Sequence, residues 1–310
     1  RLLAALFFFC LFTLPAAGEE GGAKKWDGSV ATALKFGKDA GDKGDPIKIS
    51  TPEELAYFAQ QVNAGGTNLS YGENGTIDQI TVENYKGGFS GYYFALSDNI
   101  DLAGENWTPI GTGSNRFCGH FDGQGHVVKG LKVDMSNGSD VIYAGLFGNV
   151  VDGTIQNLGV ELADAGIVVS AEKGHVYAGG IAGKITAFSS GKNVILRNCY
   201  VTGKGGVRIT GAGKDASAGG ITGHTAESSG IVRITHCYTL VDVEATGTKN
   251  TYAGGIAGYA VGELSYTYAT GMVEVKGGTT LAAGGICGSP PDNLSNNLAL
   301  NGEITGSGYF

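Results

Sequence analysis

The sequence predicts an all-β protein: a parallel β-helix (solenoid) with three short strands per coil and one N-terminal capping α-helix. Glycine supplies 55 of the 310 residues, far above the usual share of ~7%. A Gly-rich motif recurs five times along the chain, and β-like apolar segments follow each copy. The hydrophobic fraction of 42% is enough for a packed core and excludes a globally disordered chain.

Charge and cysteine content narrow the class of protein further. The chain has 21 Lys and Arg against 29 Asp and Glu, a net charge of −8. Nucleic-acid binding needs a positive surface, so we expect no nucleic-acid partner. Five cysteines are too few for a scaffold held together by disulfides, and the core must therefore supply the stability.

Residues 1–18 have the layout of a secretory signal peptide. Arg1 precedes a mostly apolar stretch from Leu2 to Leu14, and small residues follow up to Gly18. The apolar stretch is shorter than the ~20 residues that a membrane span needs. We therefore expect export, with the protein secreted or at the cell surface, and no transmembrane span in this fragment.

Residues 19–50 are expected to be extended, and a capping helix is expected over residues 51–65. Thr51 can cap a helix that starts with Pro52, and acidic residues follow in the first turn. Apolar residues recur at helical spacing up to Val62. Because the open end of a solenoid exposes unpaired backbone groups and apolar interior, we expect this helix to cover that end.

Residues 66–310 are predicted to form the β-helix, with repeats that start near residues 143, 177, 217, 252 and 282. Each start carries the sequence A-G-L-F-G or A-G-G-I-x-G, and two further β-like pieces follow it. A fixed period of about 20 to 50 residues is typical of stacked repeats that cover one another. A β-propeller also has such a period, but its blades need four antiparallel strands, and three strands per repeat can be recognised here.

Two sets of equivalent residues are expected to stack inside the coils. Cys199 and Cys237 take the same place in successive repeats. Their predicted spacing allows a disulfide, and buried free thiols acting as small apolar fillers are the alternative. The isoleucines of the motif are expected to form an aliphatic ladder at the ~4.8 Å spacing of neighbouring strands; they are Ile181, Ile221, Ile256 and Ile286.

Several segments resemble one known family. S-T-P-E-E-L-A-Y-F starts at Ser50, W-T-P-I-G spans residues 107–111, F-D-G-Q-G-H spans residues 121–126, and A-G-G-I-A-G recurs further on. In this order they are similar to bacterial exported or cell-surface proteins with GLUG repeats, over roughly residues 46–310. The resemblance implies a β-helical extracellular segment, often regarded as adhesive and sometimes found ahead of a separate peptidase domain. It implies no catalytic residues for the repeat itself.

The sequence offers little catalytic chemistry. Glycoside hydrolysis needs two carboxylates about 5 to 9.5 Å apart, and the acids here are scattered, with Asp122 and His126 as the one compact pair. An Asx turn capped by Asp122 accounts for this pair. We therefore predict no catalytic site, no metal site and no cofactor.

Tyr143, Tyr177 and Tyr252 precede three of the motif copies and are the candidate binding residues. A row of tyrosines facing water could stack on sugar rings, and a purely structural packing role is the alternative. We predict a non-enzymatic exported module for adhesion or scaffolding that binds a glycan or a host surface protein. Two alternatives stay open: a carbohydrate-active β-helix lyase or glycoside hydrolase, and a spacer or recognition region of a larger surface peptidase.

Overall fold

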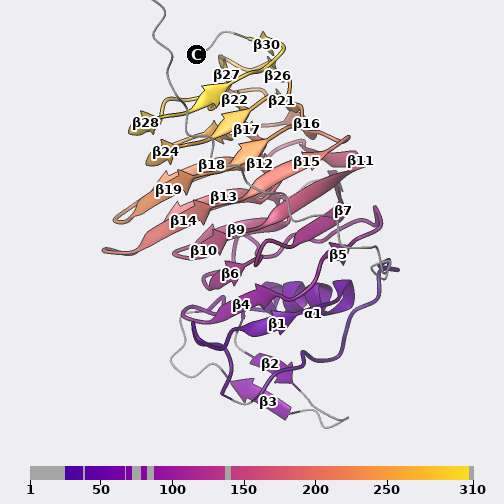
Figure 1. Cartoon of the computed structure of the whole chain (residues 1–310). Helices are drawn as coiled ribbons and strands as arrows, with labels where there is room; N and C mark the ends of the chain where they lie inside the picture. Colours follow the sequence, from indigo (N-terminus) through magenta and orange to yellow (C-terminus); the bar gives the residue numbers. More distant parts are fainter. Residues whose placement is uncertain are drawn as a thin grey trace, which may run out of the picture.

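The computed structural model describes residues 25–37, 39–66, 68–71, 78–81, 87–136 and 141–306. These residues are nearly all-β, with parallel sheets and one α-helix (Figure 1). The stacked strands run from the N-terminal elements at the bottom of the view to β30 (Ile304–Thr305) at the top. The expected signal peptide, residues 1–18, lies outside the described residues.

The helix α1 (Pro52–Asn63) forms where the sequence predicts it, and its cap explains its start. The Glu54 amide donates to Thr51 Oγ1 at 3.2 Å, and the Glu54 carboxylate accepts from the Ser50 amide at 2.8 Å. The first bond satisfies an amide that the first helical turn leaves without a partner, and the second ties the preceding residue to the start of the helix. Just before the helix lies β1 (Ile47–Ile49), at the end of the segment that was expected to be extended.

The apolar face of α1 packs on an aromatic core at the N-terminal end of the stack. The ring centroid of Phe58 lies 4.4 Å from that of Phe94 and 5.7 Å from that of Phe117, and all three side chains are buried. The antiparallel strands β2 (Asn68–Tyr71) and β3 (Asp78–Thr81) lie further out at the same end (Figure 1). The helix therefore covers apolar interior at this end of the stack.

The other described strands form four parallel sheets. The first sheet contains β1, β4 (Tyr93–Leu96), β6 (His120–Asp122), β10 (Thr154–Gln156), β14 (Asn193–Arg197), β19 (Ile231–Thr235), β24 (Glu263–Ser265) and β28 (Asn293–Ser295). The second contains β5 (Ile100–Asp101), β7 (Val127–Ser136), β11 (Gly159–Ala171), β15 (Tyr200–Gly203), β16 (Val207–Ala212), β20 (Tyr238–Thr239), β21 (Val243–Thr246), β25 (Tyr268–Ala269), β26 (Val273–Lys276), β29 (Leu298–Ala299) and β30. The third contains β8 (Val141–Ala144), β12 (His175–Gly179), β17 (Ala216–Gly219), β22 (Asn250–Gly254) and β27 (Thr280–Gly284). The fourth contains β9 (Phe147–Val151), β13 (Ala182–Ala187), β18 (Thr222–Glu227) and β23 (Ala257–Tyr259).

The three repeats between residues 175 and 276 each contain five short strands, so the prediction of three strands per coil is wrong. The predicted first strand is divided by the turn that begins at Gly180. The predicted second strand is divided at Asn198, which has a φ of 53°, and the equivalent His236 has a φ of 54°. A left-handed residue interrupts a strand, and asparagine tolerates this conformation better than most residues.

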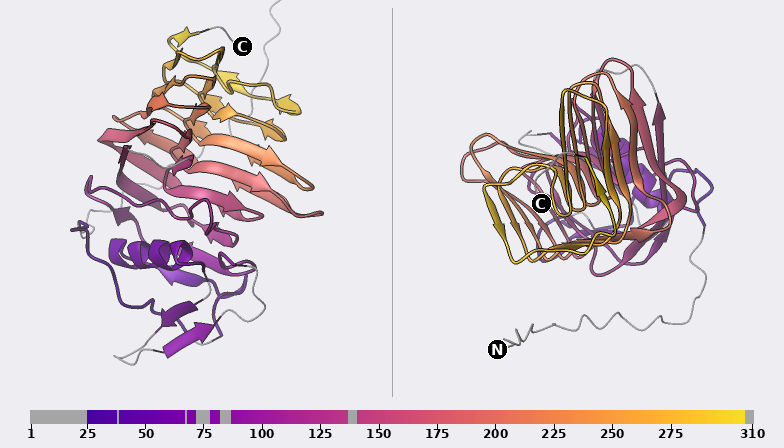
Figure 2. Two further views of the ribbon diagram at one scale, coloured as in Figure 1. Left: turned by 180° about the vertical axis from the view of Figure 1, so that it is seen from behind. Right: turned by 90° about the horizontal axis from the view of Figure 1, so that it is seen from above.

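Equivalent strands of successive repeats pair in parallel, one above another (Figure 2). The Ile181 amide donates to the Ile221 carbonyl at 3.0 Å, the Ile221 amide to the Ile256 carbonyl at 3.0 Å, and the Ile256 amide to the Ile286 carbonyl at 2.7 Å. All four isoleucine side chains are buried. Each repeat therefore covers the apolar interior of its neighbour, an arrangement compatible with a parallel β-helix.

Close contact between repeats explains the last glycine of the motif. A Cβ added to Gly223 would lie 2.4 Å from the amide nitrogen of Ala178, and one added to Gly183 would lie 2.6 Å from the amide nitrogen of Ala144. Neither position has a left-handed φ. These glycines are therefore required by lack of space between two backbones rather than by a special backbone conformation.

Candidate functional site

The three candidate binding tyrosines belong to a column of side chains on the third sheet. A second column of side chains lies next to it on the fourth sheet. The register of the third sheet sets Tyr143 beside Tyr177, Tyr177 beside Ser217, and Ser217 beside Tyr252. In the fourth sheet the corresponding column is Asn149, Lys184, His224 and Tyr259. The two columns belong to strands that are consecutive in each repeat, such as β12 and β13.

Aromatic rings from both columns form one contact chain, which we call the tyrosine–histidine cluster: Tyr143, Tyr177, His224, Tyr259 and Tyr252. In that order, neighbouring ring centroids lie 5.7, 4.7, 4.8 and 5.1 Å apart. All five side chains are partly exposed. The cluster therefore brings the three predicted tyrosines together through two residues that the sequence analysis missed.

The predicted row of tyrosines is interrupted, and His224 and Tyr259 bridge the interruption. Ser217 stands between Tyr177 and Tyr252 on the third sheet, so these two tyrosines are joined only through the neighbouring sheet. One sequence signal could have revealed the bridge, because His224 and Tyr259 each follow the last glycine of a motif copy directly. The residue that follows this glycine therefore supplies the side chain of the fourth-sheet column.

Burial controls the protonation of His224 and Tyr177. It lowers the pKa of His224 to about 3, with the charge of Lys184 as the next cause. It also raises the pKa of Tyr177 to about 12, with Asp215 and Tyr143 as smaller causes. At neutral pH the imidazole is therefore uncharged and the Tyr177 hydroxyl keeps its proton.

Lys184 supplies the positive charge beside these neutral rings. Its Nζ lies 5.5 Å from the centroid of the Tyr177 ring, within the range of a cation–π contact. Burial lowers the pKa of Lys184. Further along, His175 Nδ1 lies 3.1 Å from the Asp215 carboxylate, which also accepts from the Asn250 amide group at 3.0 Å.

In the fourth-sheet column, Asn149 and His224 each have a buried polar atom without a hydrogen-bond partner among the described residues. Asn149 is 5% exposed; its Nδ2 donates to the Thr112 carbonyl at 3.2 Å, whereas its Oδ1 is unpaired. His224 Nδ1 is likewise buried and unpaired. Buried polar atoms without partners are uncommon and destabilise a fold, which makes both atoms candidate ligand contacts.

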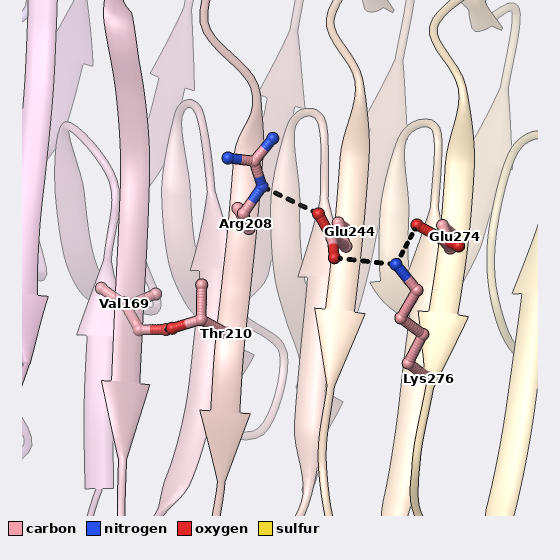
Figure 3. A network of polar contacts seen from close by, with 6 residues as sticks. All are labelled: Val169, Arg208, Thr210, Glu244, Glu274 and Lys276. Carbon is pink, nitrogen blue, oxygen red and sulfur yellow. Dashed lines mark hydrogen bonds and ion pairs between the residues drawn. The ribbon is translucent and has the colours of Figure 1, made fainter.

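A polar network lies on the second sheet and contains Arg208, Glu244, Glu274 and Lys276 (Figure 3). A pocket of about 350 Å³ lies beside it. Arg208 Nε contacts Glu244 at 2.8 Å, and Lys276 Nζ contacts Glu244 at 3.4 Å and Glu274 at 2.7 Å. The register places the two glutamates directly opposite each other, where like charges repel. Lys276 lies between the two glutamates and neutralises their repulsion. The ion pairs among these residues therefore have a structural role that needs no ligand.

A separate row of tyrosines lies on the second sheet and differs from the tyrosine–histidine cluster in its geometry. The rings of Tyr200, Tyr238 and Tyr268 are stacked 5.0 and 4.8 Å apart with interplanar angles of 6° and 3°. Parallel stacking at this distance covers the ring faces between neighbours. In the tyrosine–histidine cluster, by contrast, three of the four contacts are tilted or edge-on, which leaves part of the ring faces open.

Asp122 has the turn-capping role that explains it without catalysis. Its Oδ1 accepts from the Gln124 amide at 2.9 Å and from Asn157 Nδ2 at 3.0 Å, and its Oδ2 accepts from Gln156 Nε2 at 2.5 Å. Gln124 has a φ of 53°, so the carboxylate stabilises a left-handed turn. Among the described residues, the Asp122 carboxylate therefore accepts from Gln124, Gln156 and Asn157 rather than from the His126 side chain.

Cys199 and Cys237 are buried free thiols, and the disulfide that their spacing allows is not formed. The Sγ of Cys199 contacts the Arg197 carbonyl at 3.3 Å, and that of Cys237 contacts the Thr235 carbonyl at 3.4 Å. Burial, followed by the hydrogen bond with Cys237, raises the pKa of Cys199. Both side chains act as small apolar fillers of the interior.

The described ranges contain neither a helix that could span a membrane nor a candidate metal site. In this part of the chain no helix is both long and apolar enough to cross a bilayer. Within the same residues, no three His, Cys, Asp or Glu side chains are grouped so that they could hold a metal ion.

Comparison with known proteins supports the fold and leaves the family open. No family model matches the chain, so membership of the GLUG-repeat proteins stays a prediction. The chain is 39% identical over 84 residues to the "Putative Gly-rich membrane protein" of Evansella cellulosilytica, a match that covers 25% of this chain and 9% of that protein. A crystal structure of a "putative immunoglobulin A1 protease" from Bacteroides ovatus covers 86% of this chain and 69% of its own, with a TM-score of 0.54 and 23% identity. At that identity the likeness concerns the fold alone.

Proposed function

We propose that the chain is a non-enzymatic, exported surface or secreted module that binds glycans through the tyrosine–histidine cluster. The observation that carries this proposal is the contact chain of four tyrosines and one histidine across two neighbouring sheets. Tyrosine combines a flat apolar face with a polar hydroxyl, which suits the apolar face and the hydroxyl rim of a sugar ring.

The stacked repeats make this surface rigid before a ligand arrives. We interpret the fold as a parallel β-helix of the GLUG-repeat type, in which the strands that carry Tyr177, Lys184 and His224 are hydrogen-bonded to a strand on each side. A preorganised site loses less conformational entropy on binding. The resemblance to exported GLUG-repeat proteins, the N-terminal segment 1–18 and the name of the Evansella relative support a location at the surface or outside the cell.

A second candidate function is a recognition or spacer region of a larger surface peptidase. It is favoured by the Bacteroides ovatus structure, which covers 86% of this chain and bears a protease name. Against catalysis by this chain itself stand several described charged groups that have structural partners: Arg233 pairs with Glu263, and Asp152 accepts from the Ser189 amide. Glycan binding is compatible with both roles.

A glycan array tests the proposal. We expect the wild-type protein to bind at least one class of glycan and Tyr177→Ala to weaken that binding tenfold or more. Tyr238→Ala, which removes a tyrosine from the stacked row on the second sheet, is the matched control and is expected to bind as the wild type does. Equal binding by both variants would place the site elsewhere, and release of shortened glycans by the wild type would show an enzyme.

A further inference from the structure

We propose that the tyrosine–histidine cluster recognises an anionic sugar, one that carries a carboxylate or a sulfate ester, and that Lys184 binds the negative group. This inference rests on the proposed function and adds the class of glycan. It starts from the one cation of the two columns, which lies beside Tyr177 and is partly buried.

Lys184 is partly buried and has no carboxylate partner among the described residues. Arg233, which is also partly buried, pairs with Glu263, and the exposed Arg208 and Lys276 pair with Glu244. Among the described residues, the Lys184 ammonium group contacts the face of the Tyr177 ring. Burial of an ammonium group without an anion is unfavourable, and an anionic ligand would remove that penalty.

The unpaired atoms next to Lys184 suit the remainder of a sugar. Asn149 is the direct neighbour of Lys184 across β9 and β13, and its buried Oδ1 can accept a hydrogen bond from a hydroxyl. His224 is the neighbour on the other side, and its unpaired Nδ1 belongs to a neutral ring that can donate or accept. The column therefore offers one cation flanked by two hydroxyl-binding groups.

The negative net charge of the chain means that binding of an acidic glycan would depend on a specific cation at the site. A net charge of −8 repels polyanions at long range, so nonspecific attraction would not produce a preference for acidic glycans. Any such preference must come from a specific cation, and Lys184 is the one placed among the sugar-binding candidates.

The test compares three polymers: polygalacturonate, the same polymer after reduction of its carboxylates to neutral hydroxymethyl groups, and a sulfated galactan. We expect the wild type to bind at least one of the two acidic polymers tenfold or more tightly than the neutral one. Comparison of polygalacturonate with the sulfated galactan shows whether the site prefers a carboxylate or a sulfate ester. Lys184→Gln is expected to lower the acidic binding to the neutral level. Lys184→Arg is expected to keep the preference.

Lys192→Gln is the matched control, because it removes the same charge from an exposed position outside the cluster. It is expected to leave binding unchanged. A preference for the acidic polymer that survives Lys184→Gln would overturn the inference, and so would equal binding of all three polymers. If the array shows binding of neutral glycans alone, the proposed function stands and this inference fails; if it shows no binding, both fail.

Discussion

The ring of Tyr177 on β12 lies 4.7 Å from the ring of His224 on β18, although the two residues belong to different repeats and different sheets. This contact joins the tyrosine column of the third sheet to the column that contains Lys184 on the fourth. The cluster thus depends both on the pairing of equivalent strands and on the turn between consecutive strands. Its residues are held in place by the same stacking that forms the core.

The buried ladder predicts a large loss of stability when one isoleucine is shortened. Ile221→Ala removes a fully buried side chain between two neighbouring repeats, and we expect the free energy of unfolding to fall by about 2–5 kcal/mol. Urea unfolding measures it. Ile231→Ala, at a position that is 37% exposed, is expected to cost clearly less. Similar losses for both variants would contradict the interior role of Ile221.

The final glycine of the motif predicts a steric effect that depends on position. Gly223→Ala would place its Cβ 2.4 Å from the Ala178 nitrogen, and we expect destabilisation of about 1–3 kcal/mol or more, because backbone must move to admit the methyl group. A Cβ at Gly211 would meet no atom within 4 Å, so Gly211→Ala is the control and is expected to be near neutral. Thermal unfolding of the two variants is the measurement. Equal melting temperatures of Gly223→Ala and Gly211→Ala would show that the repeats can move apart at that point without loss of stability.

The sequence could predict the features that recur in every repeat, namely the motif glycines and isoleucines. Ile221→Ala and Gly223→Ala test these features. Periodic glycines and isoleucines indicate stacked strands because each equivalent position has the same neighbours in every repeat. The helix was predictable because Thr51, Pro52 and Glu54 act locally at its start. The predicted number of strands was wrong, because a single left-handed residue such as Asn198 divides a segment that the sequence pattern presents as continuous.

The candidate site was only half predictable for a different reason. Tyr143 and Tyr177 are equivalent positions of neighbouring repeats, so their contact follows from the period. The contact of Tyr252 with Tyr259 instead crosses the turn between β22 and β23, and the angle of that turn is set by packing in three dimensions. Sequence spacing alone carries no information about that angle.

Neutral His224 predicts a pH dependence of stability. Because its folded-state pKa is lowered from 6.5 to about 3, the unfolded chain binds more protons than the folded one between these values. The stability that the neutral ring contributes is therefore fully present above pH 6.5 and is lost as the pH falls towards 3. Lys184 and His175 act in the same direction as burial, and Asp215 opposes them.

Urea unfolding at pH 7.5 and pH 4.5 measures this effect. His224→Phe keeps an aromatic ring between Tyr177 and Tyr259 and removes the titrating group, so we expect it to lose less stability than the wild type between the two pH values. His126→Gln, outside the cluster, controls for the removal of a histidine as such. An equal loss in the wild type and in His224→Phe would show that His224 is not held neutral by the fold.

The most direct test of the glycan-binding account is hydrogen–deuterium exchange of the wild-type protein with and without the glycan that it binds best on the array. The account predicts slower exchange in peptides that contain β8, β12, β13, β18, β22 and β23, which carry the cluster and Lys184. It predicts unchanged exchange in β21 and β26, which carry the ion-paired Glu244, Glu274 and Lys276. Slower exchange confined to β21 and β26, or no change in β12 and β13, would contradict it.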